Sequence, residues 1–320
     1  MKRDVSIDIA KAITIILMVV GHCDALIPIW LFKGIFSFHL PLFFFFSGYF
    51  FSNKRTCLEE CKHSAKTFLV PYLLTGAVIV ILQWLLYSPN AALHSLQGLF
   101  MASGGRRGMP TIFPYHAGPI WFLFALFWTR VLFRIIYKVI PKHCIVASMI
   151  IGVAFMVFGK EVINLPLAFG NGASALFFYA GGYGIQLLMS KYENVVIKWR
   201  IPIFLLCLLI WMIDIRYSYL NIDQYIYHKF PLPLFGAFAG VWIVWRISAI
   251  IKGVISTWLQ FVGKHTLDIL CCHTIAFCLC AWTIRAIDVN MHPQLMVALL
   301  TVVLSVIIVT IKELLSCIKC

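Results

Sequence analysis

The chain has 320 residues, of which 62% are hydrophobic and only 12% are charged. Soluble domains carry about twice that share of charge, so the composition excludes a soluble enzyme, a disordered chain and a disulfide-stapled secreted domain. The net charge of +14 is typical of membrane proteins, which collect Lys and Arg in cytoplasmic loops. The sequence therefore predicts an all-α integral membrane protein, one domain over residues 1–320, with the lipid bilayer and no nucleic acid as its partner.

Hydrophobic runs of about 20 residues predict membrane-spanning helices. The ten predicted spans are Ile7–Leu26, Trp30–Phe51, Phe68–Tyr87, Pro119–Tyr137, Ile145–Phe158, Leu165–Met189, Ile201–Tyr219, Leu234–Ile251, Trp258–Ile284 and Leu295–Cys317. The fifth of these spans is short and the ninth is long. With the N-terminus in the cytoplasm, about 18 Lys and Arg fall on the inner side and 7 on the outer side. The positive-inside rule therefore predicts that both termini face the cytoplasm.

Three connecting segments stand out between the predicted spans. Ser52–Lys66 alternates basic and apolar residues, which predicts a short helix on the inner membrane surface. The longest outer loop, Ser88–Gly118, contains the pair Arg106 and Arg107, either an anion-binding site or a solvated loop. A second outer loop, Asn221–Pro233, is rich in Tyr. Loops of this length are often functional.

The first predicted span carries Asp8, Lys11 and His22. Ionisable residues inside a span are costly and usually functional. At about 100° per residue these three side chains share one face of a helix, and His22 lies roughly 16 Å beyond Lys11 along the axis. The alternative for Asp8 and Lys11 is an interfacial ion pair between positions i and i+3. For His22 the alternative is a structural hydrogen bond between helices.

The second predicted span carries His39 and Ser47 on one face, with Pro41 between them. A proline in a span bends the helix and frees backbone carbonyl groups, which must face protein or a cavity. The short connecting loop makes the first two spans antiparallel neighbours, so His22 and His39 lie at a similar depth. Two histidines at one depth on adjacent helices predict a reaction centre.

These motifs resemble those of the membrane acyltransferase 3 family. Lys11, ten intervening residues and His22 are similar to its basic-x10-His motif, and Phe38–Tyr49 is similar to its second-helix signature. Gly118–Leu123 and Gly263–His273 resemble two later segments, in the expected order. The nearest branch contains fucose 4-O-acetylase-like proteins of bacterial surface sugars. This sequence departs from the family by Lys11 in place of the commoner Arg and by Leu270 in place of Tyr.

The resemblance implies a multi-pass O-acyltransferase of the bacterial inner (plasma) membrane. Such proteins move an acyl group, usually acetyl, from acetyl-CoA or another acyl-CoA to a hydroxyl of a sugar or surface glycan. His22 would be the general base, and Lys11 with Asp8 would meet coenzyme A. His39 could orient His22, bind the acceptor or stabilise the oxyanion, and a covalent acyl-histidine intermediate stays open.

Four further residues are candidates for substrate binding: Ser47, Trp121, Asp268 and His273. Trp121 suits stacking on a sugar or lining the acyl channel, or it belongs to an interfacial aromatic belt. Asp268 and His273 either orient polar groups or face opposite sides of the ninth span. Two other intramembrane charges, Arg130 and Asp214, could pair with each other.

Two rival functions remain at this point. A secondary transporter of a small polar solute would also have about ten spans and buried ionisable residues, but it usually shows paired repeats, which this sequence lacks. A ligand-sensing or structural membrane protein would have no need of His22. No metal is expected, because Cys57 and Cys61 lack a second pair at metal-site spacing. The identity of the acceptor, the acyl chain length and a homo-oligomeric state stay open.

Overall fold

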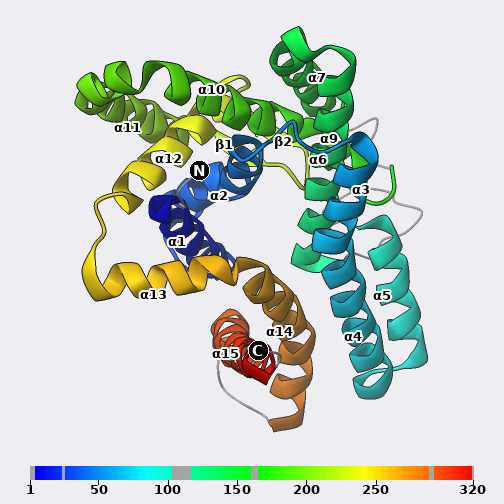
Figure 1. Ribbon diagram of the computed structural model, residues 1–320. Coiled ribbons are helices and arrows are strands. Elements are labelled where there is room, and N and C mark those ends of the chain that lie inside the picture. The colour runs from blue at the N-terminus through cyan, green and yellow to red at the C-terminus, as the bar shows by residue number, and fades with distance from the viewer. Residues whose placement is uncertain (1–3, 24–25, 103–116, 160–164, 288–291, 319–320) are drawn as a thin grey trace.

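The computed structural model describes residues 4–23, 26–102, 117–159, 165–287 and 292–318. This part of the chain is almost entirely helical, apart from a short two-stranded hairpin (Figure 1). The predicted all-α class is therefore confirmed.

The first two helices lie close to their predicted ranges. α1 spans Val5–Gly21, and its N-cap Asp4 accepts a hydrogen bond from the backbone N–H of Ser6. It ends before the predicted boundary, so that His22 is its C-cap residue. α2 spans Ile29–Tyr49 and contains Pro41.

The region after α2 differs from the prediction in two ways. α3 (Cys57–Ser64) begins at a capping box between Thr56 and Glu59 and continues through a π-helical segment, Ala65–Leu69, into α4 (Val70–Leu86). Ser52–Lys66 is therefore largely the start of one long helix and not a separate surface helix. The predicted outer loop Ser88–Gly118 begins with a helix, α5 (Pro89–Met101), capped by Ser88. Arg106 and Arg107 lie outside the described residues.

The middle of the chain contains α6 (Trp121–Val139), preceded by a 3-10 turn at Gly118–Ile120, and α7 (Cys144–Val157), preceded by a 3-10 turn at Pro141–His143. The predicted sixth span divides into α9 (Phe169–Ser174) and α10 (Leu176–Lys198). α11 spans Arg200–Tyr217.

The Tyr-rich loop that follows forms an antiparallel hairpin of β1 (Tyr219–Asn221) and β2 (Ile226–His228). α12 spans Leu232–Ser248. The predicted ninth span is wrong as one helix, because it breaks at His265 into α13 (Gly253–Lys264) and α14 (Thr266–Ile287). α15 spans Pro293–Ile318 and packs against α14.

The outer surface of these helices is apolar, which is characteristic of a membrane protein. Several helices expose large apolar side chains in series, such as Leu205, Leu206 and Leu209 on α11 and Val302, Val303 and Val306 on α15. Soluble monomers rarely expose contiguous apolar patches of this size. Among the described residues, four helical segments are long and apolar enough to span a bilayer, namely Ile29–Tyr49, Cys57–Leu86, Gly118–Val139 and Pro293–Leu314, beside shorter apolar helices. The count of ten spans stays a prediction.

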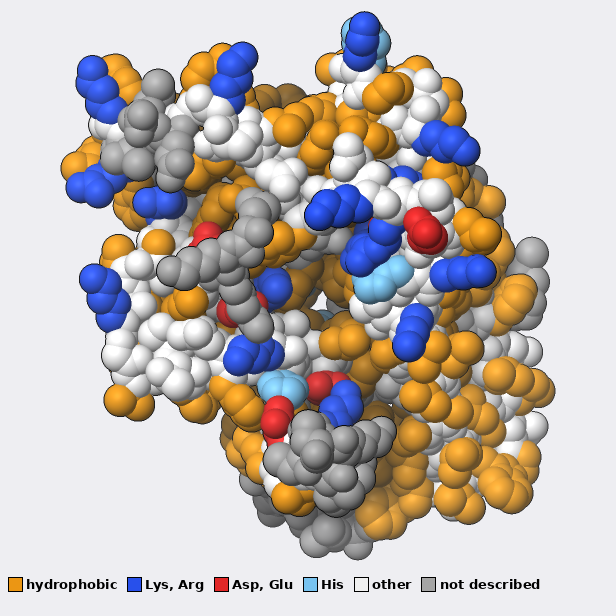
Figure 2. Space-filling model, in the orientation of Figure 1, with side chains coloured by type: hydrophobic (Ala, Val, Ile, Leu, Met, Phe, Trp, Pro, Cys, Tyr) orange, Lys and Arg blue, Asp and Glu red, His pale blue; other side chains and the backbone are white. Residues whose placement is uncertain are grey.

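The start of α1, the end of α13, the start of α14 and the end of α15 lie at one end of the molecule. The backbone of Asp8, near the start of α1, packs against Gly263 at the end of α13. Lys312, near the end of α15, forms an ion pair with Asp268 at the start of α14. We call this the basic end, because Figure 2 shows Lys and Arg side chains gathered over this face, around a central hollow. Its cytoplasmic location stays a prediction.

α2 lies at the centre of one half of the bundle, where α1, α10, α11 and α12 contact it (Figure 1). Its approach to α10 is unusually close. A Cβ atom on Gly48 would lie 1.9 Å from the carbonyl oxygen of Tyr179, and one on Gly182 would lie 1.9 Å from that of Phe45. Small residues at helix contacts allow this backbone approach in membrane proteins. The α2–α10 contact fixes the position of α2, the helix that carries His39.

We expect Gly182→Ala to destabilise the protein, because the new methyl group meets backbone atoms that a rotamer change cannot move. Overpacking of this kind costs on the order of 1–3 kcal/mol. The matched control is Gly184→Ala on the same helix, where the nearest atom to a Cβ lies at 3.7 Å. This control should be neutral or stabilising by up to about 1 kcal/mol, the helix propensity of alanine. Thermal unfolding of both variants in detergent compares them, and equal melting temperatures would contradict the prediction.

Candidate active site

A cavity of about 1020 Å³ lies between α1, α2, α4, α6 and α14. Near the basic end its wall includes Phe68 and Leu267. Near the opposite end it includes Tyr219 and Asn221 of the hairpin. The size suits a small-molecule site, and the lining extends from side chains near the basic end to the tip of the hairpin.

Four histidines of the described residues lie at or beside this cavity, and one of them is His94 of α5, which lines it. His22 and His39 also line it, so α1 and α2 bring these two residues to one cavity. His273, from α14, is fully buried behind the wall, and its ring centroid lies 5.1 Å from that of His22. Phe36 lies between the two predicted histidines, with its ring centroid 6.3 Å from that of His22 and 4.8 Å from that of His39.

The hydrogen bond of His39 defines its tautomer. Its Nδ1 lies 3.0 Å from the carbonyl oxygen of Ile35, one turn earlier in α2. A carbonyl oxygen only accepts hydrogen bonds, so Nδ1 of His39 carries the hydrogen. In the neutral imidazole Nε2 is then a hydrogen-bond acceptor. His39 is buried, with 5% of its surface exposed, and burial in apolar surroundings favours the neutral form.

Trp121 lines the same cavity, at the first turn of α6, and is 5% exposed. This position agrees with a role in lining the channel. Gly118, three residues earlier, adopts φ = +66°, a conformation that side chains with a Cβ rarely adopt. The glycine is therefore required for the turn that directs Trp121 into the wall.

Lys11 and Asp8 continue the cavity face of α1 toward the basic end. Ile15, Met18 and His22 line the cavity, and positions 8 and 11 fall on the same helical face. Nζ of Lys11 lies 3.6 Å from Oδ1 of Asp8. The predicted i,i+3 ion pair is present, and neither residue lines the cavity itself.

Two of the predicted substrate-binding residues lie outside the cavity. Ser47 is close to the basic end of α2 and does not line the cavity. Asp268 is engaged elsewhere, because it forms ion pairs with Lys312 of α15 and with His265, whose Nδ1 lies 3.2 Å from Oδ2. Asp268 and His273 are five residues apart on α14, so at about 100° per residue they point to different sides of that helix.

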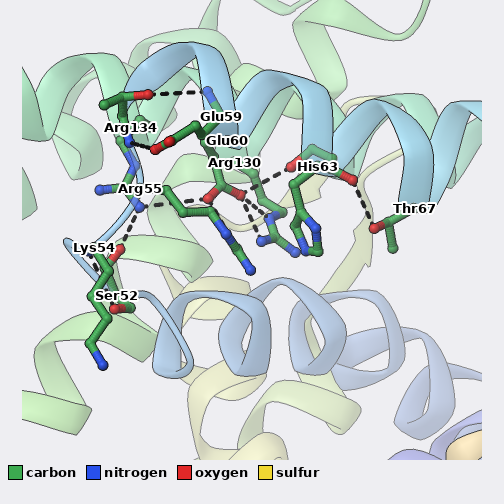
Figure 3. A network of polar contacts seen from close by, with 11 residues as sticks. Ser52, Lys54, Arg55, Glu59, Glu60, His63, Thr67, Arg130 and Arg134 are labelled. Atoms are coloured by element: carbon green, nitrogen blue, oxygen red, sulfur yellow. Dashed lines mark hydrogen bonds and ion pairs between the residues drawn. The ribbon is translucent and has the colours of Figure 1, made fainter.

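An ionic cluster at the basic end was missed by the sequence analysis. Glu60 of α3 is 3% exposed and faces Arg55, Arg130 and Arg134 (Figure 3). Its Oε1 accepts hydrogen bonds from NH2 of Arg130 at 2.6 Å and from Nε at 2.9 Å. The predicted pairing of Arg130 with Asp214 is therefore wrong. The ring of Phe68, which lines the cavity, lies 5.6 Å from the guanidinium carbon of Arg130.

The sequence also did not predict which residues line the cavity at the hairpin. Asn221, Asp223 and Gln224, at the tip of the hairpin, line it together with His94 of α5. Asn171 secures this tip, because its side-chain amide donates to the carbonyl oxygens of Ile222 and Asp223. The Tyr-rich composition indicated a functional loop, but only the hairpin turns these polar groups toward the cavity.

Within the described residues, no group of three or more His, Cys, Asp or Glu side chains could hold a metal ion. The cavity instead offers imidazole rings, which in the neutral form carry a basic nitrogen. Such groups can accept a proton from a hydroxyl.

Comparison with known proteins agrees with this geometry. A family model described as an acyltransferase domain, acyltransferase 3, matches residues 4–312. The nodulation protein NolL of Sinorhizobium fredii is 29% identical over 177 residues, which are 51% of this chain and 45% of that protein. The chain therefore matches under half the length of this relative. No solved structure matches the chain. Since the family model covers nearly the whole sequence, the protein belongs to the acyltransferase 3 family of multi-pass membrane acyltransferases.

Proposed function

We propose that the protein is an O-acyltransferase that moves an acyl group, acetyl in the first instance, from acyl-CoA to a hydroxyl of a sugar or surface glycan. The supporting observation is that His22 and His39 line one cavity, whose wall extends from Phe68 near the basic end to Asn221 of the hairpin. Membership of an acyltransferase family favours this function over the transport of a polar solute. The proposed location is the bacterial inner membrane.

The donor enters at the basic end. Coenzyme A is anionic, and a surface rich in Lys and Arg attracts anions and raises their local concentration. Lys11 lies on the α1 face that continues to Ile15 and Met18 in the cavity wall. The pantetheine arm follows this face, so that the thioester reaches His22. This path gives Lys11 its role as a contact for the polar part of the donor.

The acceptor enters at the hairpin. Sugar hydroxyls need polar partners, and Asn221, Asp223 and Gln224 supply amide and carboxylate groups at that end of the cavity. Trp121 adds an aromatic surface deeper in the wall. A sugar held at this end of the cavity would present one hydroxyl toward His22.

The chemistry follows from the two imidazoles. His22 removes the proton of the acceptor hydroxyl as general base, while the oxygen forms a C–O bond with the acyl carbon. The thioester C–S bond breaks, and the proton on His22 passes to the sulfur. Neutral His39 offers Nε2 only as a hydrogen-bond acceptor, so it suits binding of the sugar better than stabilising an oxyanion, which needs a donor.

The function is tested by mass spectrometry of surface glycans and small metabolites from cells with and without the protein. We expect an acyl group on a hydroxyl compound only where the protein is present. Inside-out membrane vesicles given acetyl-CoA labelled in its acetyl group should transfer the label to the same compound. Accumulation of a labelled sugar without a change in its mass would instead identify a transporter.

Replacing Lys11 with alanine should raise KM for the acyl-CoA donor by about 10-fold, the effect of losing one hydrogen bond to a charged group. kcat at saturating donor should change little, because Lys11 lies roughly 16 Å from His22 along the axis of α1. Lys11→Arg should keep the wild-type KM, and Lys191→Ala, at an exposed position, serves as the control. Initial rates over a range of donor concentrations measure both constants, and an unchanged donor KM would refute the role of Lys11.

A further inference from the structure

His273 has a partner on the last helix. Its Nδ1 lies 2.8 Å from Oγ1 of Thr301, in the middle of α15. Both residues are buried, with exposed fractions of 0% and 2%. Because α15 packs on α14, this hydrogen bond joins the last helix to the histidine beside the reaction centre.

The direction of the hydrogen bond defines the tautomer of His273. The Thr301 hydroxyl donates its single hydrogen to the carbonyl oxygen of Val297, at 2.7 Å. It therefore meets His273 as an acceptor, and Nδ1 of His273 carries the hydrogen. Nε2 of the neutral ring is left with a lone pair.

That lone pair is unused within the described structure. Nε2 of His273 is buried and has no hydrogen-bond partner there. Buried polar atoms without partners are rare in native proteins and call for an explanation. The His22 ring, 5.1 Å away between centroids, is the neighbouring group whose charge changes during the proposed reaction.

We propose that Thr301 is a positioning residue that holds His273 as a hydrogen-bond acceptor for His22. The proposal rests on the proposed acyl transfer. When one ring nitrogen of His22 takes the proton of the acceptor hydroxyl, the imidazolium that forms carries an N–H on both ring nitrogens. Nε2 of His273 accepts the N–H of the other nitrogen and stabilises the positive charge, while the proton that came from the hydroxyl passes to the departing sulfur. The ester C–O bond forms and the thioester C–S bond breaks. The products are the ester and the free thiol of coenzyme A, so atoms and charge balance.

The test begins with Thr301→Val, which keeps the shape of the side chain and removes the hydroxyl. We expect kcat for acyl transfer to fall by on the order of 10- to 100-fold, the loss found for partners that orient metal-binding histidines. KM for donor and acceptor should stay unchanged. Thr301→Ser restores the hydroxyl and should restore kcat. Thr283→Val is the matched control, because Thr283 bonds only to its own helix, at the carbonyl oxygen of Leu279.

Two further measurements separate positioning from a general packing effect. In full-length protein labelled with ¹⁵N-histidine, the signal of His273, assigned through His273→Asn, should show the hydrogen on Nδ1 in wild type and Thr301→Ser. In Thr301→Val it should show a mixture of tautomers. The double variant Thr301→Val/His273→Asn should be no less active than His273→Asn alone, because Thr301 acts only through the His273 ring, which His273→Asn already removes.

The outcomes separate the role of Thr301 from the proposed acyl transfer itself. Wild-type kcat and tautomer in Thr301→Val would overturn the role of Thr301 while leaving acyl transfer intact. Failure of Thr301→Ser to restore kcat would do the same. If the wild-type protein itself transfers no acyl group, the proposed function fails, and the tautomer measurement then reports only a structural hydrogen bond.

Discussion

Replacing His22 with alanine should reduce acyl transfer by about 10²–10⁴-fold, the contribution typical of a general base. The structure supports this expectation because His22 lines the cavity, at the C-cap of α1, where both substrates would meet. Because His22 is the C-cap residue and lies outside the helical turns of α1, alanine at this position should leave the helix intact, and the variant should still insert and fold. The measurement is kcat of the purified protein at saturating acyl-CoA, beside its melting temperature in detergent.

The matched control for this change is His143→Ala. His143 is an exposed histidine in the 3-10 turn before α7 and is remote from the cavity lining. It should keep wild-type activity. Full activity of His22→Ala would contradict the proposed mechanism and would favour the reading of His22 as a structural residue.

Replacing Glu60 with glutamine should destabilise the protein more than any surface change. Glutamine keeps the size of the side chain but removes the negative charge that faces Arg55, Arg130 and Arg134 (Figure 3). Side-chain exposures of 4% for Glu60 and Arg134 and 18% for Arg130 leave little water to replace that charge. Breaking a buried ion pair by removing one partner costs about 3–5 kcal/mol.

The neighbouring Glu59→Gln is the control for Glu60→Gln. Glu59 is exposed and serves the capping box of α3 with Thr56, and glutamine also satisfies that motif, so its effect should stay within about 0.5 kcal/mol. Thermal unfolding in detergent compares the two variants. In the double variant Glu60→Gln/Arg130→Met the loss should be smaller than the sum of the single losses, because the partners interact directly. Equal stability of the two single variants would contradict the importance of the cluster.

The sequence predicted the helical class and the pair His22 and His39 for a clear reason. Polar side chains in apolar runs are expensive, so the few that remain stand out, and helical periodicity places them on a face without any knowledge of the packing. The same periodicity predicts that Asp8 and Lys11 share the face of His22, and the structure pairs these two residues with each other. It failed for Ser47, since sharing a helical face with His39 does not tell how far a cavity extends along that face.

Helix breaks were harder to predict. The apolar run Trp258–Ile284 reads as one long span, yet it turns at His265 into α13 and α14. The break falls within the polar stretch Gly263–Asp268, so the sequence did carry a signal of it, but the apolar residues on both sides led to one predicted span. Conversely, Pro89–Met101 has too mixed a composition for a span, although Ser88 followed by Pro89 is a helix start.

The sequence by itself determined that this chain is a helical membrane protein and which ionisable residues its apolar runs retain. Only the tertiary structure decided how those residues are paired. Arg130 meets Glu60 and not Asp214, Asp268 meets Lys312, and His273 meets both His22 and Thr301. Pairing depends on which helices pack together and on their relative rotation, and these follow from the fit of side chains across the whole bundle. Composition and periodicity are local properties of the chain, so they identify the charged and polar groups but not their partners.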